Sequence, residues 1–554
     1  MPAARTLWNQ RIKVYDGAEM AADVLLPAGP GPFPTVVLRT PYGRGRYLNN
    51  PRGWIRMVDY GYAFVVVDVR GRNDSGGDWI PCVKDSTDAY GVIEWAARQA
   101  WSTGNVGMVG GSYDGLTQWW TVIGRPPHLR CIAPQCVGSF RGRLPYGNGI
   151  PLQYWLWWMN LVSGKTMQFS GAPSWEAFIT HLPLRTLDER FGLSRSAWQA
   201  YVNGDIEFFS DAATLASADY AQIDIPVLIG VGWWDDQETM LAWQALQSAK
   251  SAADCRLLIG AWDHAGNTAP RPVLGGLEVW ASVMDTIDYT EQFLALHLKG
   301  ERKAIADAPR CRVFLTGENR WEALDRWPHP QAMMMPWFLA SEGDARGLNG
   351  NGRLVRELGS TSDADSFVFD PNEPSRDMSS LAMFAWADPP LDYRYLQRRK
   401  DTLVYTSAVL SDPLMVSGRF QLEVYICSNR SDTDLYLGLS DVHPDGRAIG
   451  LAPTNEPLSG LRLRYRDGSN PKPMIPGAIY KVSIEGSWVH HVFKAGHRLR
   501  LMLHSGSFPF TVRNAGTGAH WAEGTVLHPQ TNTVYHSNEY RSRILLPVVA
   551  RDAH

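Results

Sequence analysis

The chain has 554 residues, of which 45% are hydrophobic and 20% charged, and its formal net charge is −3. These proportions are typical of an ordinary globular protein, and the length is too great for a single hydrophobic core. The small negative charge excludes the basic surface that binding of nucleic acid or of an anionic membrane requires.

The sequence indicates neither export nor membrane insertion. Its first residues lack the apolar segment of a secretory signal, and no run approaches the roughly 18 apolar residues of a membrane span. Its six cysteines are scattered without a CxxC pair, which is typical of buried thiols in a reducing compartment. We therefore predict a cytoplasmic protein without disulfide bonds.

Short apolar strands alternate with helical stretches over the first 140 residues. Residues 33–43 and 62–71 read as strands, and the second has almost no polar alternation, as expected of a strand covered on both faces. Residues 85–100 have a helical period, with Asp and Ser at the start to cap the helix. Residues 105–111 and 131–138 are two further strands. This alternation predicts an α/β protein with a parallel sheet.

The pattern changes twice after residue 140. Residues 141–222 are rich in aromatic residues, helix-like and free of strand runs, which predicts a helical cap inserted into the sheet. Buried-strand runs return at residues 223–237 and 255–267, and a long helix is expected over residues 279–300. The sheet is therefore expected to resume after the insertion.

Beyond residue 330 the chain is all-β in character. Short strand runs such as "SGRFQLEVYICS" recur between Gly, Pro, Asp and Asn, which indicates a sandwich or jelly roll. The expected domains are the first part of an α/β-hydrolase domain at 1–140, a helical cap at 141–222, the second part of the hydrolase domain at 223–330 and a β jelly roll at 331–554.

The stretch "NVGMVGGSYDGLTQWW" places Ser112 at a glycine-rich bend between a strand and a helix. Such a bend exposes a serine hydroxyl at the carboxyl edge of the sheet, where the serine can act as a nucleophile. Glycines are needed there because a Cβ would clash with the neighbouring strand or helix. The backbone N–H of Tyr113 would then face the oxygen on which charge develops. The alternative is a tight turn with an incidental serine.

A serine nucleophile requires a base and an acid to orient that base, in the chain order Ser, Asp or Glu, His. The run "IPVLIGVGWWDD" offers Asp235 or Asp236 just after a strand, and we favour Asp235 because it comes first. Among the 14 histidines, only His264 directly follows a buried-strand run in the α/β part. We predict that it is the base.

Seven motifs in order, namely "TPYGRG", "DVRGRNDSGGDW", "GNVGMVGGSYDGLTQW", "GWWDD", "GAWDH", "FLALHLKG" and "DVHPDGRAI", resemble the cocaine-esterase-like hydrolases. This family groups with X-Pro dipeptidyl-peptidases and α-amino-acid ester hydrolases. The resemblance covers nearly the whole chain and is weakest in the cap. It implies a nucleophile at Ser112, an orienting acid at Asp235, a base at His264 and a second oxyanion donor in the Tyr42 hydroxyl. Without the family, Tyr42 reads equally well as a core residue.

The resemblance also implies substrate contacts. Trp158 matches a cap tryptophan that lines the acyl pocket, the alternative being simple helix packing. Asp236 and Glu238 follow the orienting acid, where carboxylates of the amino-acid ester hydrolases hold a substrate ammonium group, although the register differs by one residue.

Three functions remain open from the sequence. The favoured one is a serine esterase for small aromatic or hydrophobic acyl esters. The second is a hydrolase of α-amino esters or X-Pro amides, and the third is a binding protein on an inactive hydrolase fold. No metal or other cofactor is expected, because His490, His491 and His497 lack ligand spacing. The oligomeric state stays open, with a homodimer through the jelly roll as one candidate.

Overall fold

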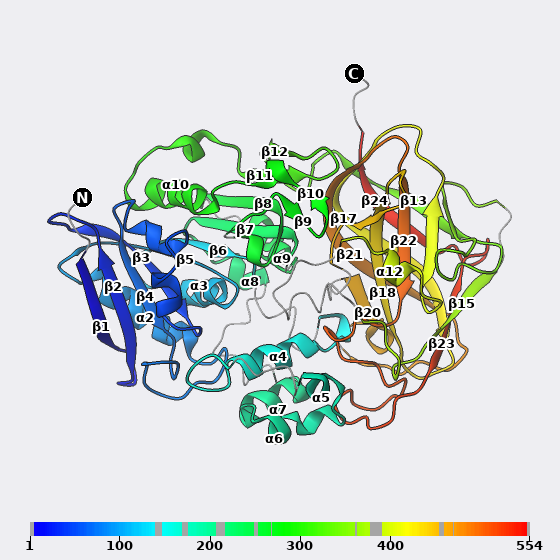
Figure 1. Ribbon diagram of the computed structural model, residues 1–554, viewed down its shortest axis with the longest axis horizontal. Coiled ribbons are helices and arrows are strands. Elements are labelled where there is room, and N and C mark those ends of the chain that lie inside the picture. Colours follow the sequence, from blue (N-terminus) through cyan, green and yellow to red (C-terminus); the bar gives the residue numbers. More distant parts are fainter. Residues whose placement is uncertain are drawn as a thin grey trace.

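The chain folds around two large β-sheets that lie side by side, with helices below and between them (Figure 1). The computed structural model describes residues 5–138, 147–168, 175–205, 217–235, 237–248, 253–267, 269–359, 363–376, 391–453, 459–468 and 470–550. The N-terminal part forms an α/β-hydrolase sheet and the C-terminal part is all-β, as the strand–helix alternation and the later run of short strands predict.

Within the described residues the first sheet has ten strands in the order β1-β2-β4-β3-β5-β6-β7-β8-β11-β12. The seven strands from β4 to β11 run parallel, whereas β1, β2 and β12 pair antiparallel at the two edges. The strands are β1 (Arg5–Lys13), β2 (Glu19–Leu26), β3 (Phe33–Thr40), β4 (Ala63–Asp68), β5 (Ser102–Gly111), β6 (Leu129–Gln135), β7 (Val227–Trp234), β8 (Cys255–Asp263), β11 (Cys311–Leu315) and β12 (Arg320–Leu324).

Burial explains why these runs form central strands. Every residue of β4, β7 and β8 is buried, because helices cover both faces of the sheet and leave no solvated side. The covering helices include α2 (Asp85–Ala97), α3 (Tyr113–Gly124), α9 (Thr239–Ser248) and α10 (Thr286–Leu298). The short helix α1 (Gly45–Leu48) follows β3.

Two helix starts differ from the sequence expectation. Helix α2 has no side-chain cap, since Lys84 occupies the N-cap position and Asp85 turns inward to bond Arg39 and Tyr113. The helix expected from residue 279 begins only at Thr286. Its N-cap is Asp285, whose carboxylate accepts from the Asp288 N–H and thereby fixes the start of the helix.

The region expected to form a cap is helical in its described residues. It contains α4 (Gln153–Leu161), α5 (Trp175–Thr180), α6 (Leu187–Phe191), α7 (Arg195–Asn203) and α8 (Ser217–Tyr220). Figure 1 shows α4 to α7 below the gap between the hydrolase sheet and the β domain. Helix α4 therefore lies where it can contact both the loops of the hydrolase sheet and the β domain.

The second sheet has twelve strands in the described residues. Among the described residues of the β domain that this sheet forms, the longest helix is α12 (Arg394–Gln397). The strands of the sheet pair almost entirely antiparallel, with β17 bonded to β21, β23 and β24. They are β13 (Ala332–Ala340), β14 (Arg353–Val355), β15 (Ala364–Phe369), β16 (Leu403–Ser407), β17 (Leu414–Ser428), β18 (Asp434–Val442), β19 (Ala448–Gly450), β20 (Gly460–Arg462), β21 (Tyr480–Phe493), β22 (Arg498–His504), β23 (Gln530–Tyr535) and β24 (Arg543–Val549).

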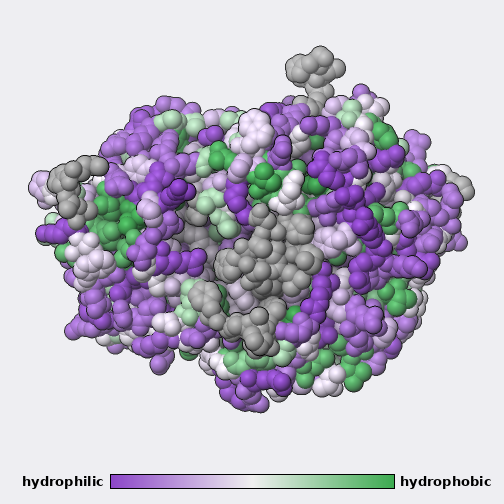
Figure 2. Space-filling view, in the orientation of Figure 1, coloured by the Kyte–Doolittle hydropathy of each residue, from purple (hydrophilic) through white to green (hydrophobic). Residues whose placement is uncertain are grey.

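One hydrophobic core extends from the hydrolase part into the β domain, where it includes Trp488 and Phe508, and the β domain has a further core of its own. The first core joins one face of the hydrolase sheet to the cap, and includes Trp119, Trp155 and Trp198, whereas the second fills the β domain around Leu422 and Leu501. Hydrophilic residues cover most of the face drawn in Figure 2. All six cysteines are buried and unpaired, as predicted. Among the helices of the described residues, none has the length and apolar character needed to cross a bilayer.

Candidate active site

Ser112 stands at a strained corner between β5 and α3. Strand β5 ends at Gly111 and α3 begins at Tyr113, so Ser112 alone makes the turn. Its backbone has φ 59° and ψ −131°, in a region that residues with a side chain rarely adopt. This is the sharp strand-to-helix turn that exposes a serine hydroxyl at the edge of an α/β-hydrolase sheet.

The glycines around Ser112 are required by close contacts. A Cβ on Gly110 would lie 2.6 Å from the Cβ of Asp114, and Gly110 has φ +140°. A Cβ on Gly115 would lie 2.7 Å from Val137 Cγ1. The helix can therefore approach β6 only because these positions carry no side chain, which is the clash that the sequence predicts.

Four polar side chains follow four adjacent strands of the sheet. Ser112 follows β5, Cys136 follows β6, Asp235 follows β7 and His264 follows β8. Because β5 to β8 run parallel, their carboxyl ends meet at one edge of the sheet. The order of strands thus brings together residues that are far apart in the sequence.

Asp235 and His264 are in direct contact. The Oδ1 atom of Asp235 lies 2.7 Å from Nδ1 of His264, and the carboxylate is buried while the imidazole is 25% exposed. Burial disfavours the imidazolium, but Asp235 and Cys136 together outweigh burial, so the pKa of His264 lies well above its usual value. Asp236, the other carboxylate considered, lies outside the described residues.

The thiol of Cys136 links His264 to the serine corner. It is hydrogen-bonded to the His264 imidazole and to the backbone N–H of Ser112. Burial raises the pKa of Cys136, and the imidazole opposes this rise. From the sequence, Cys136 is predicted only to be a buried thiol. Its position directly after a strand, shared with Asp235 and His264, is the signal that could have identified it.

Tyr42, in the loop after β3, contacts both the serine corner and the cap. Its hydroxyl is hydrogen-bonded to Ser112 and accepts from Nε1 of Trp158 on α4 at 3.0 Å. Burial, reinforced by the nearby charge of Asp114, raises the pKa of Tyr42 above its usual value. The hydroxyl therefore keeps its proton. Since its oxygen accepts from Trp158, that proton is free to be donated elsewhere.

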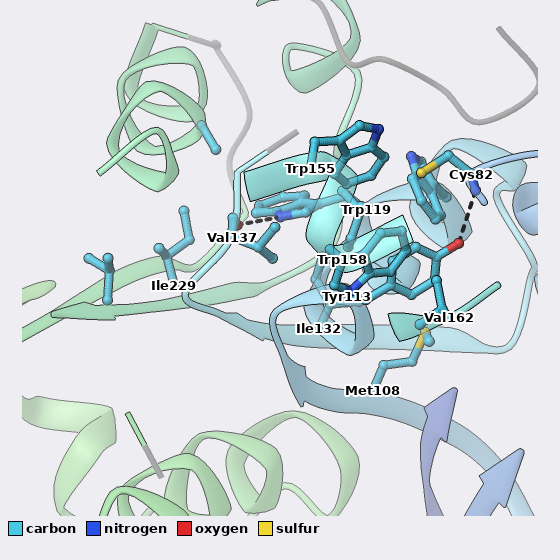
Figure 3. Packing of buried hydrophobic residues seen from close by; sticks show 14 of the residues in the cluster. Cys82, Met108, Tyr113, Trp119, Ile132, Val137, Trp155, Trp158, Val162 and Ile229 are labelled. Carbon is cyan, nitrogen blue, oxygen red and sulfur yellow. Dashed lines mark hydrogen bonds between the residues drawn. The ribbon is translucent and has the colours of Figure 1, made fainter. Parts of the chain in front are cut away.

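Trp158 also packs on Tyr113. The two rings are stacked with centroids 5.2 Å apart and planes at 16°. The ring of Trp155 also stacks on that of Trp158, with centroids 4.7 Å apart. Figure 3 shows Trp155, Trp158 and Tyr113 lying against one another. Trp158 is 5% exposed. Trp158 thus contacts the Tyr42 hydroxyl and the side chain of Tyr113, the two residues that the sequence predicts to supply oxyanion donors.

A buried ion pair anchors the Tyr113 side chain. Its hydroxyl donates to Asp85 at 2.6 Å and accepts from the backbone N–H of Cys82 at 3.1 Å, the latter drawn in Figure 3. Asp85 in turn accepts from Arg39 at 3.1 Å. Two hydrogen bonds therefore hold the hydroxyl, and the stack on Trp158 holds the ring, so the Tyr113 side chain has a fixed place beside the serine corner.

Glu238 lies between β7 and α9 and is buried, with 2% of its surface exposed. Its backbone carbonyl lies so close to Gly138 that a Cβ there would be 2.7 Å from the oxygen. An acid on such a loop is expected from the sequence to be solvated. In the structure Glu238 is instead buried, and its backbone lies beside Gly138 in the segment that follows β6.

The donor set at this edge fits acyl chemistry better than a resident cofactor. Cys136, Asp235 and His264 have ligand atoms within 4.8 Å of one another and are one of two groups in the described residues that could hold a metal ion. These three residues lie, however, at the sheet edge where Ser112 makes its strained turn, and the Tyr42 hydroxyl is hydrogen-bonded to Ser112. Fold and side chains together define a protein of the α/β-hydrolase class with a C-terminal β domain.

Comparison with known proteins specifies the class further. One family model, described as X-Pro dipeptidyl-peptidase (S15 family), matches residues 16–266, and a second, the X-Pro dipeptidyl-peptidase C-terminal non-catalytic domain, matches residues 303–545. Cocaine esterase of Rhodococcus sp. (strain MB1 Bresler) is 30% identical over 588 residues, which cover 98% of each chain. The chain therefore belongs to the hydrolase family of cocaine esterase and the X-Pro dipeptidyl-peptidases.

Solved structures share the whole fold. An alpha-amino acid ester hydrolase superposes with a TM-score of 0.85 at 23% identity, covering 99% of this chain and 97% of the other. An aminopeptidase from the marine sediment archaeon Thaumarchaeota archaeon gives the same TM-score and identity, with 99% and 96% covered. At this identity the likeness shows the fold of both the hydrolase sheet and the β domain.

Proposed function

We propose that the chain is a serine hydrolase that cleaves small carboxylic esters through an acyl-enzyme. The observation that carries the proposal is the 2.7 Å contact between Asp235 and His264 at the sheet edge where Ser112 makes its turn. In this assignment Ser112 is the nucleophile, His264 the base and Asp235 the acid that orients the base.

The reaction proceeds in two matching halves. His264 takes the proton of Ser112 as the serine oxygen bonds to the ester carbonyl carbon, and then gives that proton to the departing alkoxide. The serine is left as an ester of the acyl group. Water then attacks the acyl carbon and loses a proton to His264, which returns that proton to the Ser112 oxygen as the bond between this oxygen and the acyl carbon breaks and the acid leaves. Asp235 accepts from Nδ1–H throughout and so leaves Nε2 of His264 as the proton acceptor.

The developing oxyanion is held by two donors, the Tyr42 hydroxyl and the Tyr113 N–H. The hydrogen bond from Trp158 supports the first role, because it occupies the acceptor side of the Tyr42 oxygen and leaves its proton for the substrate. The Asp85 contact supports the second, because it fixes the Tyr113 side chain beside the serine corner. Each donor of this kind contributes about 3 kcal/mol to transition-state stabilisation.

The preferred acyl group is aromatic or hydrophobic. The cap places the buried indoles of Trp155 and Trp158 close to the proposed oxyanion donors, so the acyl group would enter aromatic, apolar surroundings. The relative with 30% identity is named for an ester substrate, which agrees with this choice. This mechanism requires no cofactor.

A second candidate is a hydrolase of α-amino esters or X-Pro amides. The observation that favours it is the burial of Glu238 just after β7, where a carboxylate would bind a substrate ammonium group; Asp236 next to it lies outside the described residues. The family models carry the name of X-Pro dipeptidyl-peptidases. An inactive binding protein is disfavoured because each triad and oxyanion position is filled by a competent residue.

A substrate panel tests these alternatives. The native chain should hydrolyse a p-nitrophenyl ester, and Ser112→Ala should lower kcat by about 10⁶. Phenylacetyl, glycyl and Gly-Pro chromogenic substrates then separate the two candidates. Preference for glycyl or Gly-Pro substrates, lost in Glu238→Gln, would replace the first candidate by the second. Equal activity of the native chain and Ser112→Ala would refute both.

We also propose a cytoplasmic location. Six buried cysteines without a disulfide support it, because thiols in this state are typical of reducing compartments. A homodimer through the β domain stays a prediction, which sedimentation of the purified chain would test.

A further inference from the structure

The proposed acid, Asp235, lies between two residues whose side chains bond the β domain. Directly before it, Trp234 donates from Nε1 to the Gly450 carbonyl on β19 at 2.9 Å. Two positions after it, Gln237 bonds the backbone of Trp488 on β21. The loop that carries the acid follows strand β7 of the hydrolase sheet, yet it is hydrogen-bonded to the β domain on both sides of Asp235.

The amide of Gln237 pairs with both polar groups of one backbone residue. Its Oε1 accepts from the Trp488 N–H at 2.7 Å, and its Nε2 donates to the Trp488 carbonyl at 3.2 Å. The same Nε2 donates to the Trp233 carbonyl at 3.0 Å and so closes the loop around Asp235. Gln237 and Trp488 are each only 1% exposed. A carboxamide offers a donor and an acceptor side by side, so an apolar residue at 237 would leave buried backbone groups unpaired.

Four buried indoles surround this junction. The ring of Trp233 lies 5.8 Å from that of Trp327, which lies 5.4 Å from that of Trp488. Trp243 on α9 donates from Nε1 to the Trp327 carbonyl at 2.9 Å. All four side chains are at most 2% exposed. Hydrogen bonds are stronger in such apolar surroundings than in water, so the bonds of Gln237 hold the loop firmly to the β domain.

The proposed base is held by the hydrolase sheet. His264 directly follows β8, which pairs with β7 and β11, and beside it the Gly266 N–H donates to Asp263 at 2.9 Å. The 2.7 Å contact between Asp235 and His264 therefore joins a loop bonded to the β domain to a loop held by the sheet. A misplacement of about 1 Å at a catalytic group can lower a rate about 100-fold, so this contact depends on how the β domain holds Asp235.

We propose that Gln237 is a positioning residue for Asp235, and that through it the β domain holds the acid at hydrogen-bond distance from His264. The bond from Trp234 to Gly450 is a second tie of the same kind. This inference rests on the proposed function, since it requires Asp235 to orient the base. It gives the β domain a part in catalysis, although the family model that matches this part of the chain is described as a non-catalytic domain.

Gln237→Met is the diagnostic variant, because methionine has a similar length but no group that can pair with the Trp488 backbone. The assay is the steady-state hydrolysis of a p-nitrophenyl ester by the full chain over a range of pH. We expect kcat to fall about 10- to 100-fold while KM stays within about 3-fold. Asp235 and Cys136 raise the pKa of His264, so a weaker contact with Asp235 should also move the acid midpoint of kcat/KM to lower pH.

Gln530→Met is the matched control. Gln530 is also fully buried, and its amide bonds Asn514 and Thr433 within the β domain. This variant loses the same group but leaves the loop of Asp235 untouched. We expect its kcat to stay within about 3-fold of the native value and its acid midpoint to stay in place.

A second pair of variants keeps the test decisive if Gln237→Met does not fold. Trp234→Phe and Trp233→Phe each remove one indole N–H, which donates to Gly450 of the β domain in the first case and to Phe314 of the hydrolase sheet at 2.8 Å in the second. We expect Trp234→Phe to lower kcat about 5-fold and Trp233→Phe to leave it within about 2-fold. Equal losses in the two variants would contradict the proposal.

A double-variant cycle separates positioning from a general loss of structure. In an Asp235→Asn background, Gln237→Met should lower kcat by less than about 3-fold, because the acid through which Gln237 acts is already lost. Losses that multiply in this cycle, or equal kcat in Gln237→Met and Gln530→Met, would overturn the proposal and leave the esterase assignment standing. Undiminished turnover by Ser112→Ala, measured in the same series, would instead refute the proposed function and this inference with it.

Discussion

Trp158→Phe tests how the cap takes part in catalysis. The substitution removes the indole N–H that donates to the Tyr42 hydroxyl at 3.0 Å but keeps an aromatic ring to stack on Tyr113. Without that bond, the Tyr42 proton is less well directed toward the oxyanion. A neutral hydrogen bond contributes about 1 kcal/mol net, so we expect kcat/KM to fall about 5-fold.

Tyr42→Phe provides the reference for this effect. It removes the proposed oxyanion donor itself, which costs about 3 kcal/mol and therefore lowers kcat by about 100- to 200-fold. The double variant completes a cycle. If Trp158 acts through Tyr42, then Trp158→Phe should have little further effect when residue 42 is already Phe, and the two losses will not add.

The assay is the steady-state hydrolysis of a p-nitrophenyl acetate ester by all four proteins. An acetyl group is small, so a change in the volume of the acyl pocket affects it little. Losses that simply multiply in the double variant would refute the reasoning, because Trp158 would then act by packing or by substrate contact and not through the Tyr42 hydroxyl.

Three further predictions concern the residues around the proposed base and oxyanion donor. The base must be neutral, and the neighbours of His264 raise its pKa above 6.5, so kcat/KM of the native chain should fall on the acid side with a midpoint above pH 6.5. In Asp235→Asn this midpoint should move to lower pH, and the maximum of kcat/KM should fall by about 10⁴. An unmoved midpoint would contradict the pairing of Asp235 with His264. Cys136→Ser should keep kcat/KM within about 10-fold, since the mechanism does not use the thiol, whereas a loss as large as that of Ser112→Ala would make Cys136 the nucleophile. Asp85→Asn should lower the free energy of unfolding in denaturant by about 3–5 kcal/mol because it leaves Arg39 buried without its charge partner, and a loss below about 1 kcal/mol would show that this ion pair is dispensable.

The parts of the fold that the sequence predicts are those whose burial leaves a simple pattern. Strand β4 is buried on both faces and reads as a continuous apolar run, so its existence follows from the residues alone. Strand β1 was not expected. It lies at the edge of the sheet, and most of its residues are exposed or half-buried, so no apolar pattern marks it.

The same distinction holds for the site. A strand end marks Ser112, Asp235 and His264 locally, and parallel strands bring such ends together, so their proximity is predictable. The hydrogen bond from Trp158 to Tyr42 joins residues 116 positions apart, and no local pattern carries it. The sequence places Trp158 only as a pocket wall. The catalytic roles stay predictions until the variants are measured.

Trapping of the acyl-enzyme tests the central claim most directly. The chain is mixed with a p-nitrophenyl ester, quenched in acid and digested with trypsin, and the acylated peptide is identified by mass spectrometry. Cleavage after Arg130 places Ser112 and Cys136 in different peptides. We predict that the acyl group is on the peptide that contains Ser112 and is absent from Ser112→Ala. An acyl group on the Cys136 peptide, or turnover that persists in Ser112→Ala, would contradict the assignment.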